Sequence, residues 1–162
     1  MSELFNRRYT AQTDGPFVVF LIGVRFNRLR AMCRWLPVAQ AMRPMLQTLY
    51  AHPEKGFLDG STWLGWRSVL LVQYWRSFED LERFARSPSD PHRDAWRRFN
   101  QSVGSDGTVG IWHETYLIEP ERHEAIHGNM PRVGLAAALG HSPVTAGRTA
   151  ARERLRGEEV GV

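Results

Sequence analysis

The stretch Gly107-Thr-Val-Gly-Ile-Trp-His-Glu-Thr-Tyr-Leu-Ile118 is the most informative part of the sequence. It is rich in β-branched and aromatic residues and Pro120 follows its end, so it is predicted to form a β-strand. Side chains of a strand alternate between its two faces. One face is therefore expected to carry Trp112, Glu114 and Tyr116, and the other Ile111, His113, Thr115 and Leu117. A His and a Glu are costly to bury in an apolar strand without partners, which indicates a polar site or a structural hydrogen-bond pair.

The chain before this strand alternates between strand and helix patterns. Apolar and β-branched runs predict strands at residues 16–25, 56–66 and 67–75, and helical spacing predicts helices at residues 36–52 and 77–86. Pro44 is expected to break or kink the first helix, because proline removes a backbone donor. Ser77 is a good N-cap for the second helix. A further short helix is expected from Pro91 to Asn100.

With the 107–118 strand added, the order is strand, helix, strand, strand, helix, strand. That order is typical of the ferredoxin-like α+β fold, an antiparallel sheet with helices on one face. The other face must also be covered, and a second copy of the chain covers it most simply, which predicts a dimeric α+β barrel. The expected organisation is a flexible arm at residues 1–15, the barrel domain at 16–140, and a mobile or partner-wrapping tail at 141–162.

Composition narrows the class of protein. A chain of 162 residues, 43% of them hydrophobic, fits one globular domain. The apolar run Phe17–Val24 is too short to span a bilayer and lacks the flanks of a signal peptide, so a soluble, cytoplasmic protein is expected. Cys33 is the single cysteine, which excludes an intrachain disulfide. The basic residues are twenty Arg and Lys55 without a nucleic-acid fold signature, so neither nucleic acid nor a membrane is an expected partner.

Four motifs carry a resemblance to a known family. They are Tyr74–Ala85 (YWRSFEDLERFA), Pro91–Trp96 (PHRDAW), Gly110–Tyr116 (GIWHETY) and His123–Leu135 (HEAIHGNMPRVGL). The chain resembles the antibiotic-biosynthesis-monooxygenase-like dimeric α+β barrels, and within them the branch that contains the small monooxygenase of fumagillin biosynthesis. The likeness covers roughly residues 16–138, and His127 stands where that branch usually has Tyr.

The resemblance implies the barrel fold and an oxidative chemistry. Barrels of this kind include cofactor-free monooxygenases that act on electron-rich aromatic or polyketide substrates. They also include haem-binding members that degrade haem, use peroxide or dehydrate aldoximes. In the haem-degrading members the axial His comes from a helix after the third strand, so the resemblance makes His92 the candidate haem ligand. The alternative for His92 is a helix N-terminal residue satisfied by solvent or by Asp90.

Three residues of the 107–118 strand are candidates for catalysis: His113, Glu114 and Tyr116. His113 and Glu114 point to opposite faces and cannot form a direct acid–base pair. One is expected to face a pocket beside the helices and the other the dimer side, and the sequence leaves open which. Either could move a proton, with hydrogen bonds to the substrate from Tyr116 or Trp112. The alternative is a satisfied His or Glu that fixes strand register or the dimer contact.

Other aromatic and polar residues are candidates for substrate binding. The predicted binding residues are Trp112, Tyr74, Trp96, Trp66, Asn129 and Arg132. The aromatic members would line a flat apolar pocket, and the alternative is that they fill the core and the dimer interface. Asn129 and Arg132 would orient a carbonyl or carboxylate, or else only shape a loop. His123 and His127 have the i, i+4 spacing of metal ligands without an evident third ligand, so no metal is expected.

These residues predict a small-molecule monooxygenase of secondary metabolism, using dioxygen and an apolar or aromatic substrate in a pocket between sheet and helices. No nicotinamide or flavin motif is present, so no cofactor is expected. The first alternative is a haem-dependent dehydratase, peroxidase-like or haem-degrading enzyme with His92 as axial ligand. The second is a non-catalytic, dimeric ligand-binding module.

Overall fold

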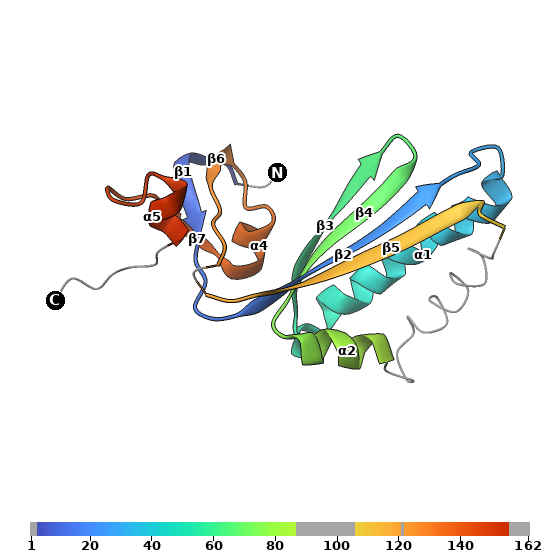
Figure 1. Ribbon diagram of the computed structural model, residues 1–162, viewed down its shortest axis with the longest axis horizontal. Coiled ribbons are helices and arrows are strands. Elements are labelled where there is room, and N and C mark those ends of the chain that lie inside the picture. Colours follow the sequence, from blue (N-terminus) through green and yellow to red (C-terminus); the bar gives the residue numbers. More distant parts are fainter. Residues whose placement is uncertain (1–2, 87–105, 121, 156–162) are drawn as a thin grey trace.

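The computed structural model describes residues 3–86, 106–120 and 122–155, except for the side chains of Arg34 and residues 37–45. The chain forms two antiparallel sheets that lie end to end (Figure 1). The larger sheet and its helices contain β2 (Phe17–Phe26), α1 (Met32–Ala51), a 3-10 turn η1 (Pro53–Lys55), β3 (Phe57–Gly65), β4 (Ser68–Trp75), α2 (Phe78–Arg86) and β5 (Val109–Ile118).

The larger sheet has the strand order β3-β4-β2-β5, with all neighbours antiparallel. From β2 to β5 the elements follow the order β-α-β-β-α-β. This order, with this antiparallel sheet, defines the ferredoxin-like α+β fold, as predicted. The four predicted strands and the helix after Ser77 are confirmed within a few residues. Strand β3 has a register shift against β4 between Phe57 and Asp59. The short helix predicted at residues 91–100 lies outside the described residues.

One prediction about the first helix is wrong. Helix α1 runs unbroken from Met32 to Ala51, through Pro44, and it begins earlier than the expected residue 36. Leu46 and Leu49, which follow Pro44, both pack against the sheet core. Tertiary packing of one face supplies most of a helix's stability, so packing beyond the proline outweighs the loss of one backbone donor.

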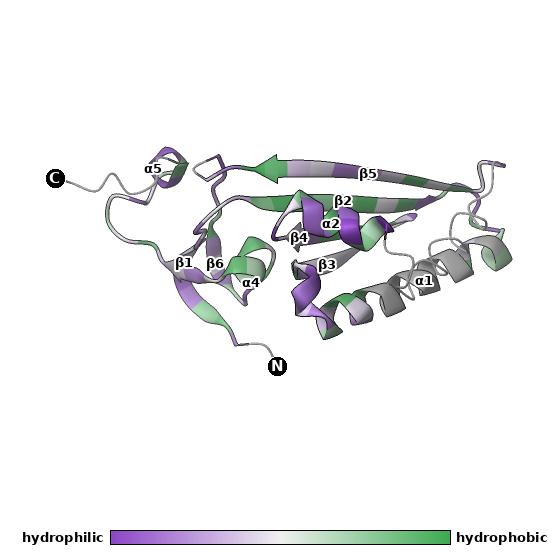
Figure 2. Cartoon of the chain, turned by 90° about the horizontal axis from the view of Figure 1, so that it is seen from below, coloured by the Kyte–Doolittle hydropathy of each residue, from purple (hydrophilic) through white to green (hydrophobic). Residues whose placement is uncertain are grey.

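Helices α1 and α2 cover one face of the larger sheet. Val18 and Trp75 of the sheet, Leu49 of α1, and Leu81 and Phe84 of α2 form one cluster, and each is at most 7% exposed. Burying a side chain of this size contributes about 1.5–3 kcal/mol relative to exposure. The central strand β2 is hydrophobic along most of its length (Figure 2). Near its start both faces of the strand are buried, which is typical of a strand with a nearly continuous apolar sequence.

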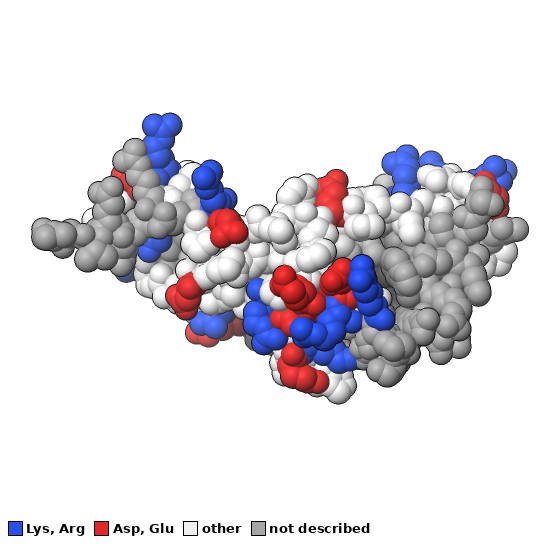
Figure 3. All heavy atoms as spheres, turned by 60° about the horizontal axis from the view of Figure 1, so that its bottom comes forward, with Lys and Arg blue, Asp and Glu red and all other residues white. Residues whose placement is uncertain are grey.

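A charged cluster holds the start of α2. The Oγ of Ser77 accepts a hydrogen bond from the Asp80 backbone N–H at 3.1 Å, which confirms the predicted N-cap. The buried Asp80 carboxylate accepts hydrogen bonds from Arg76 at 2.8 Å and Arg83 at 2.7 Å, and the bond from Arg76 lowers the pKa of Asp80. Gly56 has a φ of 84°, and a Cβ there would lie 2.3 Å from the Asp80 carboxylate. Charged side chains gather around α2 on this side of the molecule (Figure 3).

The smaller sheet contains β1 (Phe5–Ala11), β6 (His127–Met130) and β7 (His141–Pro143), in the order β6-β1-β7, together with the short helices α4 (Leu135–Leu139) and α5 (Ala151–Leu155). The irregular arm predicted before residue 16 therefore contains a strand instead. Its pairing partners come from more than a hundred residues later in the chain, which a local pattern does not reveal.

Helix α4 joins the two sheets. Its Leu135 is buried with Phe17 of β2 and Ala11 of β1, and Tyr74 packs against them. A Cβ at Gly134, just before α4, would lie 3.2 Å from the Tyr74 hydroxyl, so the chain passes close over β4. The α4 end of the larger sheet is thus covered by the chain's own C-terminal part. No helix among residues 3–86, 106–120 and 122–155 is long and apolar enough to cross a membrane.

We expect the smaller sheet to lose stability at mildly acidic pH because of His141. The His141 ring stacks on Tyr9 at 4.4 Å and meets Phe5 edge-on at 4.5 Å. Neither ring nitrogen has a hydrogen-bond partner in the described part of the chain. Burial, and then the nearby Arg132 charge, lower the pKa of His141 from its usual 6.5. The unfolded chain therefore binds the proton more readily, and this contribution to stability is full above about pH 6.5 and is lost as pH falls toward the lowered pKa.

Urea unfolding at pH 7.5 and pH 5 measures this effect. His141→Phe keeps the aromatic contacts and removes the titrating group, so its stability should fall less between the two pH values than that of the unmodified protein. The same fall in both proteins would show that His141 does not contribute.

Candidate active site

A pocket of about 260 Å³ lies between the larger sheet and α2, and we call it the helix-side pocket. The described residues that line it are Phe20, Ile22, Gln73, Trp75, Phe78, Leu81, Glu82, Phe84, Ala85, His113 and Thr115. Most of its accessible wall is apolar, with a few polar groups among the hydrocarbon. An apolar concavity with few convergent polar groups is typical of a small-molecule site.

His113 contributes an imidazole to the described lining of this pocket. Register places His113 beside Ile22 of β2, and its ring lies 5.9 Å from that of Phe20. The even-numbered residues of β2 pack against the helices, so His113 shares their face. The structure thus decides what the sequence left open, because β5 turns His113 toward the helices and Glu114 away from them.

Gln73 is a second polar group of the pocket, and sequence reasoning missed it. It is 2% exposed, and its Oε1 accepts a hydrogen bond from Trp75 Nε1 at 3.0 Å. Its amide nitrogen makes no hydrogen bond to another described residue. The alternation of β4 places Gln73 on the same face as Leu71 and Trp75, so a lone amide in an apolar strand was the available signal.

The opposite face of the larger sheet, which we call the open face, carries the other predicted residues of β5. Trp112, Glu114 and Tyr116 share it with Trp63 of β3 and Val72 of β4. Trp63, Trp112 and Tyr116 are 60%, 43% and 46% exposed, although they are large and apolar. In one copy of the chain, the open face is therefore an exposed aromatic surface beyond the part that α4 covers.

Two contacts order the open face. The Tyr116 hydroxyl donates a hydrogen bond to the Glu114 carboxylate at 2.5 Å, and this bond raises the pKa of Tyr116. The Trp112 ring lies directly over Gly23 of β2, where a Cβ would come within 2.2 Å of the indole nitrogen. Glycine inside a strand often marks such a close approach. Glu114 and Tyr116 thus form a pair of their own, on the other side of the sheet from His113.

The remaining predicted binding residues are scattered. Tyr74 lies on the α4 end of the open face, and burial raises its pKa. Trp66 is 89% exposed in the turn between β3 and β4. Asn129 accepts a hydrogen bond from the Arg7 backbone N–H at 2.9 Å, and the Arg132 guanidinium lies 5.4 Å from the centre of the Phe5 ring. The structure does not bring these residues to the helix-side pocket.

His92 and Trp96 lie outside the described residues. His123 and His127 do not share a helix face, because His127 begins strand β6 and its Nε2 lies 3.1 Å from the Val133 carbonyl oxygen. Within the described ranges, no cluster of three or more His, Cys, Asp or Glu side chains is arranged to hold a metal ion.

The chain is thus a ferredoxin-like α+β domain with an apolar pocket between its sheet and a helix, and the described lining of that pocket includes the imidazole of His113. More narrowly, the chain belongs to the monooxygenase af470-like family, whose model matches residues 17–135. The family indicated by the sequence motifs is thereby confirmed. A curated relative, monooxygenase af470 of Aspergillus fumigatus, is 24% identical over a match that covers 80% of this chain and 53% of the relative. The chain thus spans about half the length of that relative.

Solved structures with a similar arrangement share little sequence with the chain. SnoaB of Streptomyces nogalater, a cofactor-independent oxygenase, is 11% identical with a TM-score of 0.45, over 62% of this chain and 90% of SnoaB. Rv0793 of Mycobacterium tuberculosis is 16% identical with a TM-score of 0.44, over 63% of this chain and 97% of that protein. The fold assignment rests on the strand order and register given above.

Proposed function

We propose that this protein is a small-molecule monooxygenase that needs no cofactor, acts in secondary metabolism, and binds an apolar or aromatic substrate in the helix-side pocket. The observation that carries the proposal is the position of His113, a proton acceptor at the exposed edge of an apolar pocket, in a chain of the monooxygenase af470-like family. Gln73 and Thr115 lie on β4 and β5, on either side of β2, so about 10 Å separates their strands. That width suits a fused-ring or extended conjugated substrate.

In the proposed reaction the substrate supplies all the electrons. A methylene group whose deprotonation gives a phenolate or an enolate reacts with dioxygen to form a ketone and water: R–CH2–R′ + O2 gives R–C(=O)–R′ + H2O. Two C–H bonds break and one C=O bond forms, and dioxygen accepts four electrons. One of its oxygen atoms stays in the product and the other leaves as water with both hydrogens.

His113 accepts the first proton, which makes the substrate an electron-rich anion that can reduce dioxygen. The same imidazolium then returns the proton to the oxygen atom that leaves as water. The Gln73 amide N–H groups donate hydrogen bonds to the anionic oxygen of the substrate, inside a largely apolar wall that strengthens such bonds. Glu114 and Tyr116 face away from this pocket, so within one chain His113 is the favoured base.

Oxygen consumption by the purified protein tests this function. Phenolic and enolic polycyclic compounds are supplied under labelled dioxygen, with a chelator present and without added flavin, nicotinamide or haem. We expect one labelled oxygen atom in the product for each dioxygen consumed. Turnover that requires added hemin and is lost in His92→Ala would favour the haem enzyme instead. Ligand binding without any oxygen uptake would favour the non-catalytic module.

The open face is proposed to pack against the same face of a second copy, closing the dimeric barrel. Val72 lies near its centre, between Leu21 of β2 and Ser61 of β3, and the exposed rings of Trp63 and Trp112 flank it. Aromatic side chains with this much exposure are typical of a surface that a partner covers. Glu114 and Tyr116 then line the space between the two sheets.

We expect Val72→Arg to convert the dimer into a monomer, because it places a charge in an apolar interface. Sedimentation velocity measures the change. Leu64→Arg is the matched control, since Leu64 is 81% exposed and points to the other face of the same sheet, and it should remain a dimer. A monomeric unmodified protein, or a Val72→Arg variant that stays dimeric, would contradict this arrangement.

A further inference from the structure

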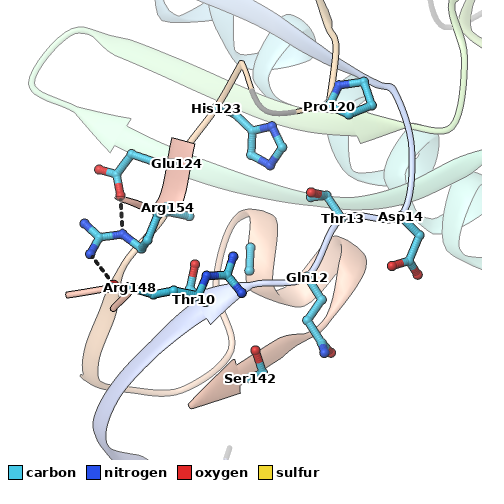
Figure 4. Close-up of a pocket in the computed structure, with 12 residues that line it drawn as sticks. Thr10, Gln12, Thr13, Asp14, Pro120, His123, Glu124, Ser142, Arg148 and Arg154 are labelled. Atoms are coloured by element: carbon cyan, nitrogen blue, oxygen red, sulfur yellow. Dashed lines mark hydrogen bonds and ion pairs between the residues drawn. The ribbon is translucent and has the colours of Figure 1, made fainter. Parts of the chain in front are cut away.

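A second cavity, of about 460 Å³, lies in the smaller lobe of the molecule, and we call it the tail pocket (Figure 4). Three parts of the chain meet around it: the end of β1 and the following linker at residues 10–14, the segment after β5 at Pro120 and residues 123–125, and the C-terminal part with Ser142, Arg148 and Arg154. Its volume is within the usual range of small-molecule sites. It shares no lining residue with the helix-side pocket.

The wall of the tail pocket is mainly polar, unlike that of the helix-side pocket. Hydroxyl groups come from Thr10, Thr13 and Ser142, and an amide comes from Gln12. Thr10 is only 4% exposed, so part of this polar wall belongs to the interior of the lobe. A polar, partly buried wall favours a ligand that makes hydrogen bonds over an apolar one.

One cation of the pocket is already paired. The buried Arg154 donates from Nε to the Glu124 carboxylate at 2.8 Å, and from a terminal nitrogen to the carbonyl oxygens of Arg148 at 3.1 Å and Thr149 at 2.7 Å. These bonds fix the segment that carries Arg148, and they use Glu124 as the counter-ion of Arg154. Arg154 is therefore part of the frame of the pocket.

Arg148 is the second arginine in the described lining of the pocket. Its side chain makes no hydrogen bond or ion pair with another described residue, and its Nε is buried without a partner. His123 presents a second buried nitrogen, Nδ1, that has no partner among the described residues. Both side chains point into the pocket, whereas Asp14 lies apart from Arg148 at its edge (Figure 4). Arg148 is partly exposed as a residue, but its buried Nε–H lacks an acceptor among the described residues; that is costly, and an anion would remove the cost.

We propose that the tail pocket binds a small, polar organic carboxylate. A planar guanidinium matches a carboxylate with two parallel hydrogen bonds, which fits Arg148. The hydroxyl groups and the Gln12 amide bind the polar remainder of the ligand, and the volume exceeds what a single inorganic ion fills. Because the pocket is built from the end of β1 and the linker after it, the segment after β5 and the C-terminal part, its ligand also holds these distant segments to each other.

Malonate is the probe for this site, with malonamide as its uncharged analogue and inorganic phosphate as a simple oxyanion. Calorimetric titration of the full-length protein in a Tris chloride buffer should show saturable binding of one malonate per chain and none of malonamide. Arg148→Gln should weaken malonate binding by about tenfold or more, as expected for loss of a charge-assisted hydrogen bond. Arg152→Gln removes the same charge from an exposed position of α5 outside the pocket, and should bind within about twofold of the unmodified protein.

If Arg148→Gln does not fold, nuclear magnetic resonance of the unmodified protein locates the malonate site without any substitution. Malonate should shift the Arg148 Nε–H signal and the His123 ring signals. No saturable binding of malonate, equal binding by Arg148→Gln, or signal changes confined to other residues would overturn the proposal. Saturable binding of phosphate without binding of malonate would also overturn it, because the site would then be one for an inorganic ion.

Discussion

Replacing His113 with Asn is expected to lower turnover by about 10²–10⁴-fold and to leave the fold intact. General acid–base catalysis contributes a factor of this size, and Asn occupies similar space without accepting a proton. His113 lies on the exposed edge of the helix-side pocket rather than among the most buried side chains, so the loss should appear in kcat and not in stability.

Initial rates of oxygen consumption with an active phenol or enol measure this effect, and circular dichroism checks the fold. His52→Asn is the matched control, since His52 is an exposed residue beyond α1 whose ring contacts Glu54, and its rate should be unchanged. If Glu114→Gln costs more activity than His113→Asn, the reacting face is the open face and the assignment of the helix-side pocket is wrong.

Replacing Trp75 with Ala is expected to destabilise the protein by about 3–5 kcal/mol. The Trp75 side chain is fully buried and meets the rings of Phe57 at 5.5 Å and Phe84 at 5.4 Å. Its removal leaves a cavity where β3, β4 and α2 meet. It also removes the indole N–H that donates to the buried Gln73 Oε1. Such a loss is a large fraction of the 5–15 kcal/mol that is usual for a domain.

Chemical denaturation with tryptophan-independent detection by circular dichroism measures this loss. Trp66→Ala deletes the same side chain from a position that is 89% exposed, and should change the free energy of unfolding by no more than about 0.5 kcal/mol. Equal effects of the two substitutions would mean that the packing around Trp75 does not support the fold as described. Because Trp75 also lines the helix-side pocket, the variant should lose substrate affinity as well.

The order of elements was predictable because its signals are local. The alternation around His113, the apolar run of β2 and the Ser77 cap each depend on residues close in sequence. The break predicted at Pro44 is absent for a physical reason. A proline costs the helix one hydrogen bond locally, but Leu46 and Leu49 pack against the sheet, and a local sequence pattern does not include that packing.

The smaller sheet was not predictable in the same way. The pairing of β1 with β6 and β7 joins the two ends of the chain, and the polar run Asn6–Thr10 has no clear strand pattern. The tail pocket depends on that pairing, so no local pattern predicts that its lining residues meet. Of the predicted binding residues, Asn129 and Arg132 belong to this lobe and hold β1 through Arg7 and Phe5.

The ferredoxin-like order, the family and the placement of His113 and Glu114 on opposite faces all follow from the sequence, because they depend on residue type and on the two-residue period of a strand. That His113 faces the helices and Glu114 the open face follows from tertiary packing alone. A strand alternates identically whichever way it is turned, so the packing of α1 and α2 on one face of the sheet must make that choice. The same long-range packing brought Gln73 and His113 into one pocket, and Arg148 and His123 into the other.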